Sequence, residues 1–370
     1  MGVAIGIDLG TDNTVVSYVD KRGRLVRFRY GEFRYDKIPS VIYFESRSEY
    51  FIGRQAQNLS MINPAAGVKN FKTHIGDPEK YSITPEEGEP FLLRSREITK
   101  LFLHKIVNSL SEELIKKFGA IDGTIGQTII TVPGNFSSTQ KGETRRAARD
   151  AGLDIVKIAA EPTAALIAYS NDGVIEKNDA VILVCKIDVR SFDVSIIRRD
   201  GNMFEEIARG GDKRLGGNVF TDKLVEYILE QVNDEYDLSM PFDEDIFYVL
   251  LRSTAENTAE NILCEFIDED FVTEYVILND GKLFEIEFAR QELDELLIDP
   301  INKMTDIINQ TLEQARDRGI KSVDKFVSVG ESAFIPTIAE MLSRKLNRTL
   351  HYADDETYAV IFPRRRSLGL

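Results

Sequence analysis

The sequence lacks paired cysteines, an excess of positive charge and any long apolar run, and each absence excludes a class of protein. Its two cysteines, Cys185 and Cys264, stand in apolar surroundings without paired spacing. We therefore expect both to be reduced core residues in a reducing compartment such as the cytoplasm. The net charge of −15 argues against nucleic-acid binding, because phosphate contacts need clustered Lys and Arg. No apolar run approaches the length of a bilayer span, so no membrane association is expected.

What the sequence does contain is one pattern that occurs twice. Val3–Val19 and Ala180–Ile197 are both predicted to form strand, turn and strand, and each is followed by a glycine turn, at Gly23 or Gly201, and a third strand. Helices are predicted after each copy. A chain of 370 residues is long enough for two cores. The repeat therefore predicts an α/β fold of two similar lobes with a cleft between them.

The other predicted elements follow the same plan in both halves. Helices are predicted over Arg96–Phe118, Ser137–Leu153, Glu161–Tyr169, Asn218–Asn233, Asp243–Leu263, Arg290–Arg318 and Ile335–Lys345. Further strands are predicted over Thr128–Val132, Ile155–Ala159, Glu274–Leu278, Leu283–Phe288 and Lys325–Val329. The segment 37–84 is mixed. We expect a first lobe over residues 1–175, to which residues 346–370 return, and a second lobe over residues 176–345.

The two copies differ at the turn that would hold a phosphate. A strand–turn–strand whose apex carries an acid, a glycine and a hydroxyl can wrap a phosphate with backbone N–H groups. The first copy has all three, as Asp8, Gly10 and Thr11, whereas the second has Lys186 for the acid and only Ser191 for the hydroxyl. The residues where small side chains would be expected are Asp188, Val189 and Arg190. One half of a phosphate clamp is therefore predicted to be intact and the other altered.

Four segments carry a resemblance over nearly the whole chain. They are IGIDLGT at Ile5–Thr11, the connecting segment Thr128–Ser170, GGDKRLGG at Gly210–Gly217 and VGESAFIP at Val329–Pro336. In this order and spacing they resemble the nucleotide-binding (ATPase) domain of the seventy-kilodalton heat-shock chaperone family (DnaK-like), within the actin, hexokinase and heat-shock superfamily. The resemblance implies two actin-like (ribonuclease-H-like) lobes, each a mixed β-sheet with flanking helices, around a central nucleotide cleft. It also implies ATP or ADP as the ligand and a role in protein folding and the stress response.

The resemblance also assigns roles to single residues. It implies catalysis by Lys72, Glu161, Asp8 and Asp193, with Lys72 near the γ-phosphate. Asp8 and Asp193 would hold Mg²⁺ indirectly, through water, if the metal binds at all. The residues that the resemblance places at the nucleotide are Gly10, Thr11, Asp12, Asn13, Ser191, Gly216, Gly217, Glu256, Gly330 and Ser332.

Several positions depart from the family's pattern. Lys186 replaces an acid, and Val189 resists the backbone conformations that glycine permits beside a γ-phosphate. Glu331 replaces a glycine of the adenosine motif, and Phe334 replaces its adenine-stacking arginine. On the adenine-facing helix, the replacements for lysine, arginine and serine are Ala259, Glu260 and Leu263. Together these changes predict weak nucleotide binding and an ATPase that is impaired or inactive.

Two interpretations of the carboxylates Asp8, Glu161 and Asp193 stay open. They form a metal–water cluster, or they tie the hairpins together by hydrogen bonds while Lys186 supplies the missing positive charge.

Three functions of the chain are possible, and the first is an adaptor or regulator of another chaperone system. The second is an active chaperone ATPase in which Asp188 has taken over the metal role, and the third, a small-molecule kinase, lacks a candidate sugar site.

The expected partners are other chaperones or co-chaperones of the J-domain or nucleotide-exchange type. The sequence ends where the family continues through an apolar linker into a peptide-binding domain. We therefore expect this chain itself to bind no substrate peptide in the family's usual mode.

Overall fold

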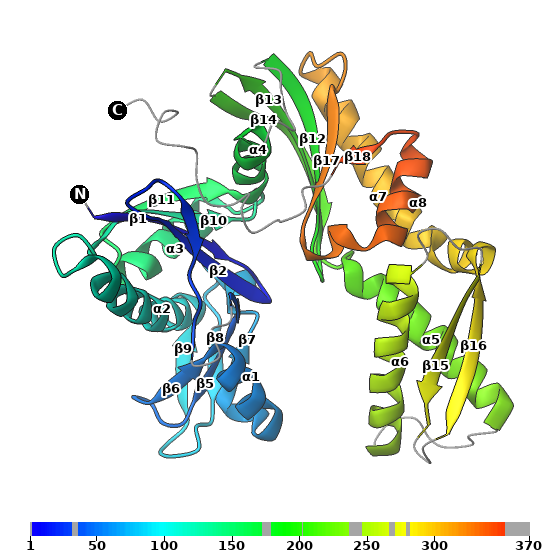
Figure 1. Cartoon of the computed structure of the whole chain (residues 1–370), viewed down its shortest axis with the longest axis horizontal. Coiled ribbons are helices and arrows are strands. Elements are labelled where there is room, and N and C mark those ends of the chain that lie inside the picture. Colours follow the sequence, from blue (N-terminus) through cyan, green and yellow to red (C-terminus); the bar gives the residue numbers. More distant parts are fainter. Residues whose placement is uncertain are drawn as a thin grey trace. The chain divides into compact units, whose positions relative to one another are not determined.

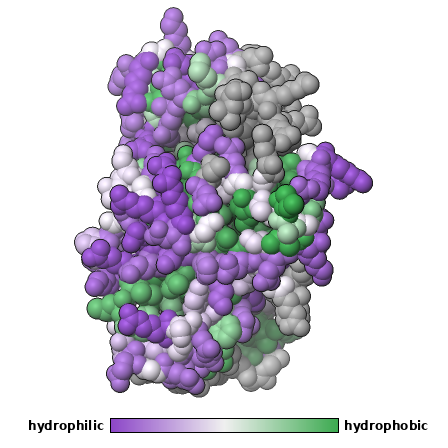
Figure 2. All heavy atoms as spheres, turned by 90° about the vertical axis from the view of Figure 1, so that its left-hand side faces the viewer, coloured by the Kyte–Doolittle hydropathy of each residue, from purple (hydrophilic) through white to green (hydrophobic). Residues whose placement is uncertain are grey.

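The computed structural model describes residues 2–31, 36–171, 179–201, 203–236, 246–265, 271–278 and 282–351. They divide into two compact units, with residues 2–171 in the first and residues 179–351 in the second (Figure 1). Each unit has its own hydrophobic core. Polar side chains dominate the face in Figure 2, with smaller apolar areas between them, as 29% charged residues would suggest.

The first unit is built on a mixed sheet with the strand order β11-β10-β1-β2-β3, and β4 pairs with β2. Its strands are β1 (Val3–Leu9), β2 (Asn13–Val19), β3 (Leu25–Arg27), β4 (Lys37–Pro39), β10 (Ile125–Val132) and β11 (Ile155–Ala160). The strands β1, β10 and β11 are parallel, whereas β2 is antiparallel to β1. Parallel strands end at the same edge of a sheet, so the residues that follow β1, β10 and β11 gather there.

Three helices of the first unit agree with the sequence analysis. They are α2 (Ser95–Phe118), α3 (Ser138–Asp150) and α4 (Glu161–Asn171). α2 buries Ile98, Phe102 and Ile106 at helical spacing in the core. Ser137 is the N-cap of α3: its hydroxyl accepts from the N–H of Gln140, while the Gln140 side chain accepts from the Ser137 N–H.

The segment 37–84 holds elements that the sequence did not reveal. With the strand that follows it, they are β5 (Val41–Phe44), β6 (Tyr50–Ile52), α1 (Gly53–Ile62), η1 (Pro64–Ala66), β7 (Gly67–Lys69), η2 (Phe71–His74), β8 (Lys80–Ile83) and β9 (Phe91–Arg94). Strands of three or four residues are too short to show alternation. The helix α1 buries only Gly53 and Ala56, so it has no apolar stripe that would predict it.

The second unit repeats the plan with the strand order β14-β13-β12-β17-β18. Its strands are β12 (Asp179–Ile187), β13 (Phe192–Asp200), β14 (Met203–Asp212), β17 (Lys325–Val329) and β18 (Leu350–His351). β18 pairs with β17, so residues 346–351 belong to the second unit. The prediction that they return to the first lobe is therefore wrong. Residues 352–370 lie outside the described residues. Cys185 on β12 is buried as predicted, and burial raises the pKa of its thiol to about 12.

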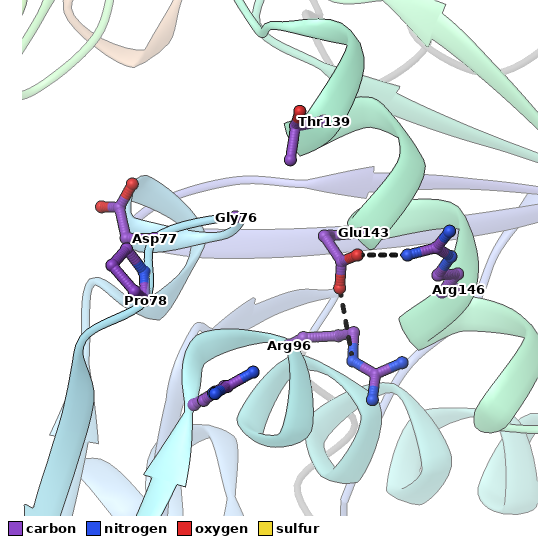
Figure 3. A pocket seen from close by; sticks show the side chains of 8 residues that line it. Gly76, Asp77, Pro78, Arg96, Thr139, Glu143 and Arg146 are labelled. Atoms are coloured by element: carbon purple, nitrogen blue, oxygen red, sulfur yellow. Dashed lines mark hydrogen bonds and ion pairs between the residues drawn. The ribbon is translucent and has the colours of Figure 1, made fainter.

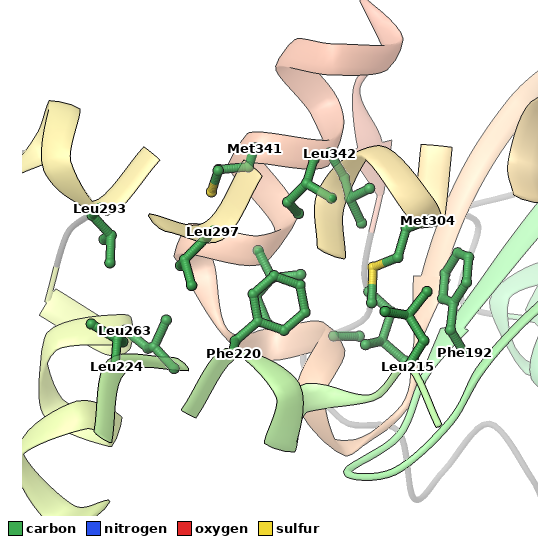
Figure 4. Packing of buried hydrophobic residues seen from close by; sticks show 14 of the residues in the cluster. Phe192, Leu215, Phe220, Leu224, Leu263, Leu293, Leu297, Met304, Met341 and Leu342 are labelled. Carbon is green, nitrogen blue, oxygen red and sulfur yellow. The ribbon is translucent and has the colours of Figure 1, made fainter. Parts of the chain in front are cut away.

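In the described residues the second unit also contains four helices and a two-stranded sheet. They are α5 (Gly217–Tyr236), α6 (Ile246–Glu265), β15 (Phe271–Ile277), β16 (Leu283–Ala289), α7 (Arg290–Asp317) and α8 (Pro336–Leu346). α7 packs on β13 and β14, and α6 packs on α5 and β15. Figure 4 shows Phe220 of α5 packed among Leu297 of α7 and Met341 of α8. The predicted α/β class, with a mixed sheet and flanking helices in each of two units, is confirmed. Among the described helices, none combines the length and the apolar character needed to cross a bilayer.

Candidate nucleotide site

The carboxyl edge of the first sheet collects the polar residues that follow its parallel strands. Asp8 near the end of β1 lies opposite Thr131 of β10, and the Thr131 hydroxyl donates to Asp8 Oδ1 at 2.7 Å. Glu161 follows β11 directly and begins α4. Asp8 and Glu161 therefore lie at one edge of the first sheet. The sequence analysis missed Thr131, because a threonine inside a strand carries no signal of its own.

Lys72 and Glu161 form a buried ion pair. Lys72 lies on η2, and its Nζ donates to Glu161 Oε1 at 2.7 Å. Each side chain is only 4% exposed. The carboxylate also lies in the first turn of α4, where the helix dipole favours negative charge. The two predicted catalytic residues are thus brought together, and the Lys72 ammonium already has a carboxylate partner within the first unit.

Ser40 fixes the first phosphate hairpin, which links β1 to β2. Its hydroxyl donates to the Gly10 carbonyl at 2.9 Å, and its N–H donates to the Asp12 carbonyl at 2.7 Å. The hydroxyls of Ser40 and Thr14 also lie 2.9 Å apart. The sequence analysis did not identify Ser40, because it lies in the mixed segment that follows β3.

Thr11 at the apex of this hairpin is available to a ligand. Within the described part of the chain, neither its N–H nor its hydroxyl forms a hydrogen bond with the protein. A phosphate oxygen would accept from groups of this kind. The first hairpin therefore keeps the open donors that a phosphate site needs.

The second hairpin spans residues 188–191 between β12 and β13, and its own backbone closes it. The Asp188 N–H donates to the Ser191 carbonyl at 2.9 Å. Among the described residues, the non-glycine residues with positive φ are Asn70 and Asn347, so this hairpin uses ordinary backbone conformations. The turn therefore accommodates Val189 without the left-handed geometry that glycines would supply.

The hairpin also bonds to the beginning of α5. The Gly217 N–H donates to the Asp188 carbonyl at 2.9 Å, and the Asn218 N–H donates to the Val189 carbonyl at 2.8 Å. Gly216 lies so close that a Cβ there would stand 2.4 Å from backbone atoms of Arg190. The first donors of α5, which could bind an anion, are therefore used within the protein.

Lys186 lies beside this hairpin and carries its own counter-ion. Its ammonium forms an ion pair with Asp188, two residues further along. Across the antiparallel pair of β12 and β13, Lys186 is the register partner of Asp193. The Asp193 carboxylate also lies next to Gly211 of β14. The expected proximity of Lys186 to Asp193 agrees with this register, whereas the ion pair with Asp188 was not predicted.

These residues do not fit a Mg²⁺ site in the second unit. The ammonium of Lys186 already supplies a positive charge to Asp188 of the hairpin, and Asp193 is the register partner of Lys186 on β13. In the described ranges, no group of three or more His, Cys, Asp or Glu side chains has the arrangement of a metal site. Asp8, the other predicted metal residue, belongs to the first unit.

A pocket of about 380 Å³ in the second unit brings together three predicted nucleotide residues, Gly217, Glu256 and Ser332. The other lining residues are Val189, Asn218, Thr221, Asp222, Glu260, Leu263 and Ile335. Gly330 precedes Ser332 with φ +109, and a Cβ there would lie 2.3 Å from the Ile187 carbonyl. The glycine is thus required where β17 ends beside β12.

Carboxylates dominate the polar lining of this pocket. Arg252 pairs with Asp222 at 3.1 Å and with Glu256 at 3.3 Å. Glu260 contributes a further carboxylate. The size of the pocket suits a nucleoside. Its wall offers the base three carboxylates, Asp222, Glu256 and Glu260, beside the polar side chains of Asn218, Thr221 and Ser332.

The comparisons with known proteins agree with the motifs. The family model described as Hsp70 protein matches residues 4–360. A chaperone protein dnaK of Guillardia theta is 30% identical over 370 residues, which cover 94% of this chain and 57% of that protein. A chaperone protein dnaK of Emiliania huxleyi is 28% identical over 380 aligned positions, covering 97% of this chain and 59% of that protein. The chain thus spans less than three fifths of these curated relatives.

Proposed function

Because this chain belongs to the Hsp70 family, we propose that it is a chaperone-type nucleotide-binding domain with weak or no ATP hydrolysis that serves as an adaptor or regulator in a chaperone system. The family binds ATP and ADP in general. The observation that carries the proposal is the second phosphate hairpin. Asp188 of this hairpin forms an ion pair with Lys186 of β12, and the carbonyls of Asp188 and Val189 accept from the first N–H groups of α5.

The hydrogen bonds of this hairpin explain why hydrolysis would be impaired. A γ-phosphate gains stabilisation from preorganised backbone donors that point at its oxygens. The N–H groups of Gly217 and Asn218 instead donate to the hairpin's carbonyls. A phosphate bound there would have to displace these bonds, each of which contributes on the order of 1 kcal/mol.

The pocket lined by Gly217, Glu256 and Ser332 also supports weak affinity for a nucleotide. Arginine stacks on a purine and adds a cation–π contribution, whereas the carboxylate of Glu260 repels the negative phosphates of a nucleotide. Leu263 lines the same pocket with an aliphatic side chain, which offers no hydrogen bond to the ligand. We therefore propose that any ATP or ADP binding is weak and depends little on Mg²⁺.

An active ATPase is the second candidate, and the open donors of Thr11 favour it. Steady-state phosphate release, measured with and without a J-domain co-chaperone, separates the two functions. Release at the background rate under both conditions supports the adaptor. Turnover that Lys72→Ala abolishes would establish an ATPase and contradict the proposal.

The partners follow from family membership. Hsp70 proteins usually work with co-chaperones, and we propose that this chain contacts chaperones or co-chaperones of the J-domain or nucleotide-exchange type. The stress-response role and the cytoplasmic location are proposals of the same kind. Affinity capture with the purified chain as bait tests the proposed partners, and capture of no chaperone component would contradict the adaptor role.

A further inference from the structure

The first unit contains a pocket of about 440 Å³ whose lining shares no residue with the candidate nucleotide site. Three parts of the chain form it: the loop after η2, the junction of β9 with α2, and one side of α3 (Figure 3). The lining residues are Gly76, Asp77, Pro78, Arg94, Arg96, Thr139, Glu143 and Arg146. Three guanidinium groups and two carboxylates thus line the pocket, and Asp150, outside the lining, also pairs with Arg96.

Glu143 occupies the middle of this arrangement. Its Oε2 lies 3.3 Å from Arg96 Nε, and its Oε1 lies 2.6 Å from Arg146 Nη1. Figure 3 shows Glu143 on α3, linked by both contacts to the two arginines. Arg96 also reaches Asp150 at 3.4 Å. The carboxylate therefore binds two guanidinium groups in the way that an anionic ligand would.

Arg94 supplies a cation that the protein leaves unused. In the ranges that the structure describes, its guanidinium forms no ion pair or hydrogen bond. Thr139 lines the same pocket from the first turn of α3, where the helix dipole adds positive potential. The free arginine and the helix end both favour an added anion over a neutral ligand.

We propose that this pocket binds a phosphate group, with Arg94, Arg96 and Arg146 as its ligands and Glu143 as an internal competitor. A phosphate dianion carries more charge than a carboxylate and offers three acceptor oxygens, so it can displace Glu143 from the guanidinium groups. The volume leaves room beyond the phosphate itself. The ligand class is therefore a small phosphomonoester or free phosphate.

The test is calorimetric titration of the purified chain with inorganic phosphate and, separately, with glycerol 3-phosphate. Arg94→Gln and Arg96→Gln should each weaken binding roughly tenfold, because each removes a charged hydrogen-bond donor. Glu143→Gln should tighten binding by a similar factor, since it removes the competing charge and keeps the shape. The gain cannot result from misfolding. Arg22→Gln, at an exposed turn outside the pocket, makes the same charge change and should leave the affinity unchanged.

Tighter binding of glycerol 3-phosphate than of phosphate would assign the site to a phosphomonoester, and equal binding would assign it to free phosphate. Either result supports the proposal when the pocket variants change the affinity as expected. Three results would overturn it. The first is no heat of binding for either probe with both the wild type and Glu143→Gln. The second is equal affinity of the wild type and Arg94→Gln, and the third is a loss of affinity in Arg22→Gln as large as in the pocket variants.

Discussion

Replacing Lys72 by methionine should destabilise the first unit strongly, because it removes one partner of a buried ion pair. The Lys72 ammonium lies 2.7 Å from the Glu161 carboxylate, and both side chains are 4% exposed. Removing one partner of such a pair costs roughly 3–5 kcal/mol, since the remaining charge stays buried without its counter-ion. The same change also tests the predicted catalytic lysine, so stability must be measured before any loss of activity is interpreted.

The double variant Lys72→Met/Glu161→Gln separates the charge effect from packing. It removes both charges and keeps the side-chain volumes, so its cost should be well below that of Lys72→Met alone. Lys69→Met is the matched control, because Lys69 is an exposed lysine three residues earlier in the chain. It should change stability by less than about 0.5 kcal/mol.

Hydrogen exchange measured by mass spectrometry suits this two-unit chain, because it reports on each unit separately. Peptides from η2 and α4 should exchange on the order of 100-fold faster or more in Lys72→Met, since each 1.36 kcal/mol is a factor of ten. Peptides of the second unit should be unaffected. Equal exchange in Lys72→Met and Lys69→Met would refute the reasoning, and so would a double variant as unstable as the single one.

Three further predictions concern single side chains. Ser40→Ala should cost roughly 1–2 kcal/mol in thermal unfolding, because it leaves the Gly10 carbonyl without its donor, and an unchanged melting temperature would argue against this role. Lys186→Asp should lower the free energy of unfolding by roughly 1–4 kcal/mol, and added Mg²⁺ should restore part of the loss. A variant whose stability is unchanged and does not respond to Mg²⁺ would show that the ammonium compensates no carboxylate. A hydrogen bond from Lys303 lowers the pKa of Asp212 below its ordinary value of 3.8. The ionised carboxylate therefore stabilises the fold at pH values above 3.8, and this contribution disappears as the pH falls through the lowered pKa. Asp212→Asn should remove that dependence in melts from pH 6 to pH 2 and change stability by less than about 1 kcal/mol, because the pair lies at the surface; an unaltered pH profile would contradict it.

The long elements could be predicted from the sequence because tertiary packing repeats along them. In α2, Ile98, Phe102 and Ile106 recur at helical spacing, and each is fully buried. The short strands β5 to β9 contain too few residues for any period to emerge. The helix α1 buries only Gly53 and Ala56 fully and packs Leu59 in part, so its sequence shows little of an apolar stripe.

The members of the candidate site could be named from motifs, but their contacts could not. Lys72 and Glu161 are 89 positions apart, and no local pattern predicts that they pair. For Lys186 the contact is local. Lys186 is near the end of β12 and Asp188 is in the hairpin that follows it, so the two charges are only two residues apart in the sequence. A metal role was considered for Asp188, whereas its ion pair with Lys186 was not predicted.

The two phosphate hairpins differ in their backbone hydrogen bonds as well as in their side chains. In the first, Ser40 holds the turn from outside, and the donors of Thr11 stay open. In the second, the carbonyls of Asp188 and Val189 hold the first donors of α5. Replacing residues 188–190 by glycine is therefore expected to raise ATP affinity only if the new turn withdraws these carbonyls. Titration with ATP tests this, and a large gain while the exchange protection of the α5 N-terminus persists would show that side chains alone blocked the site.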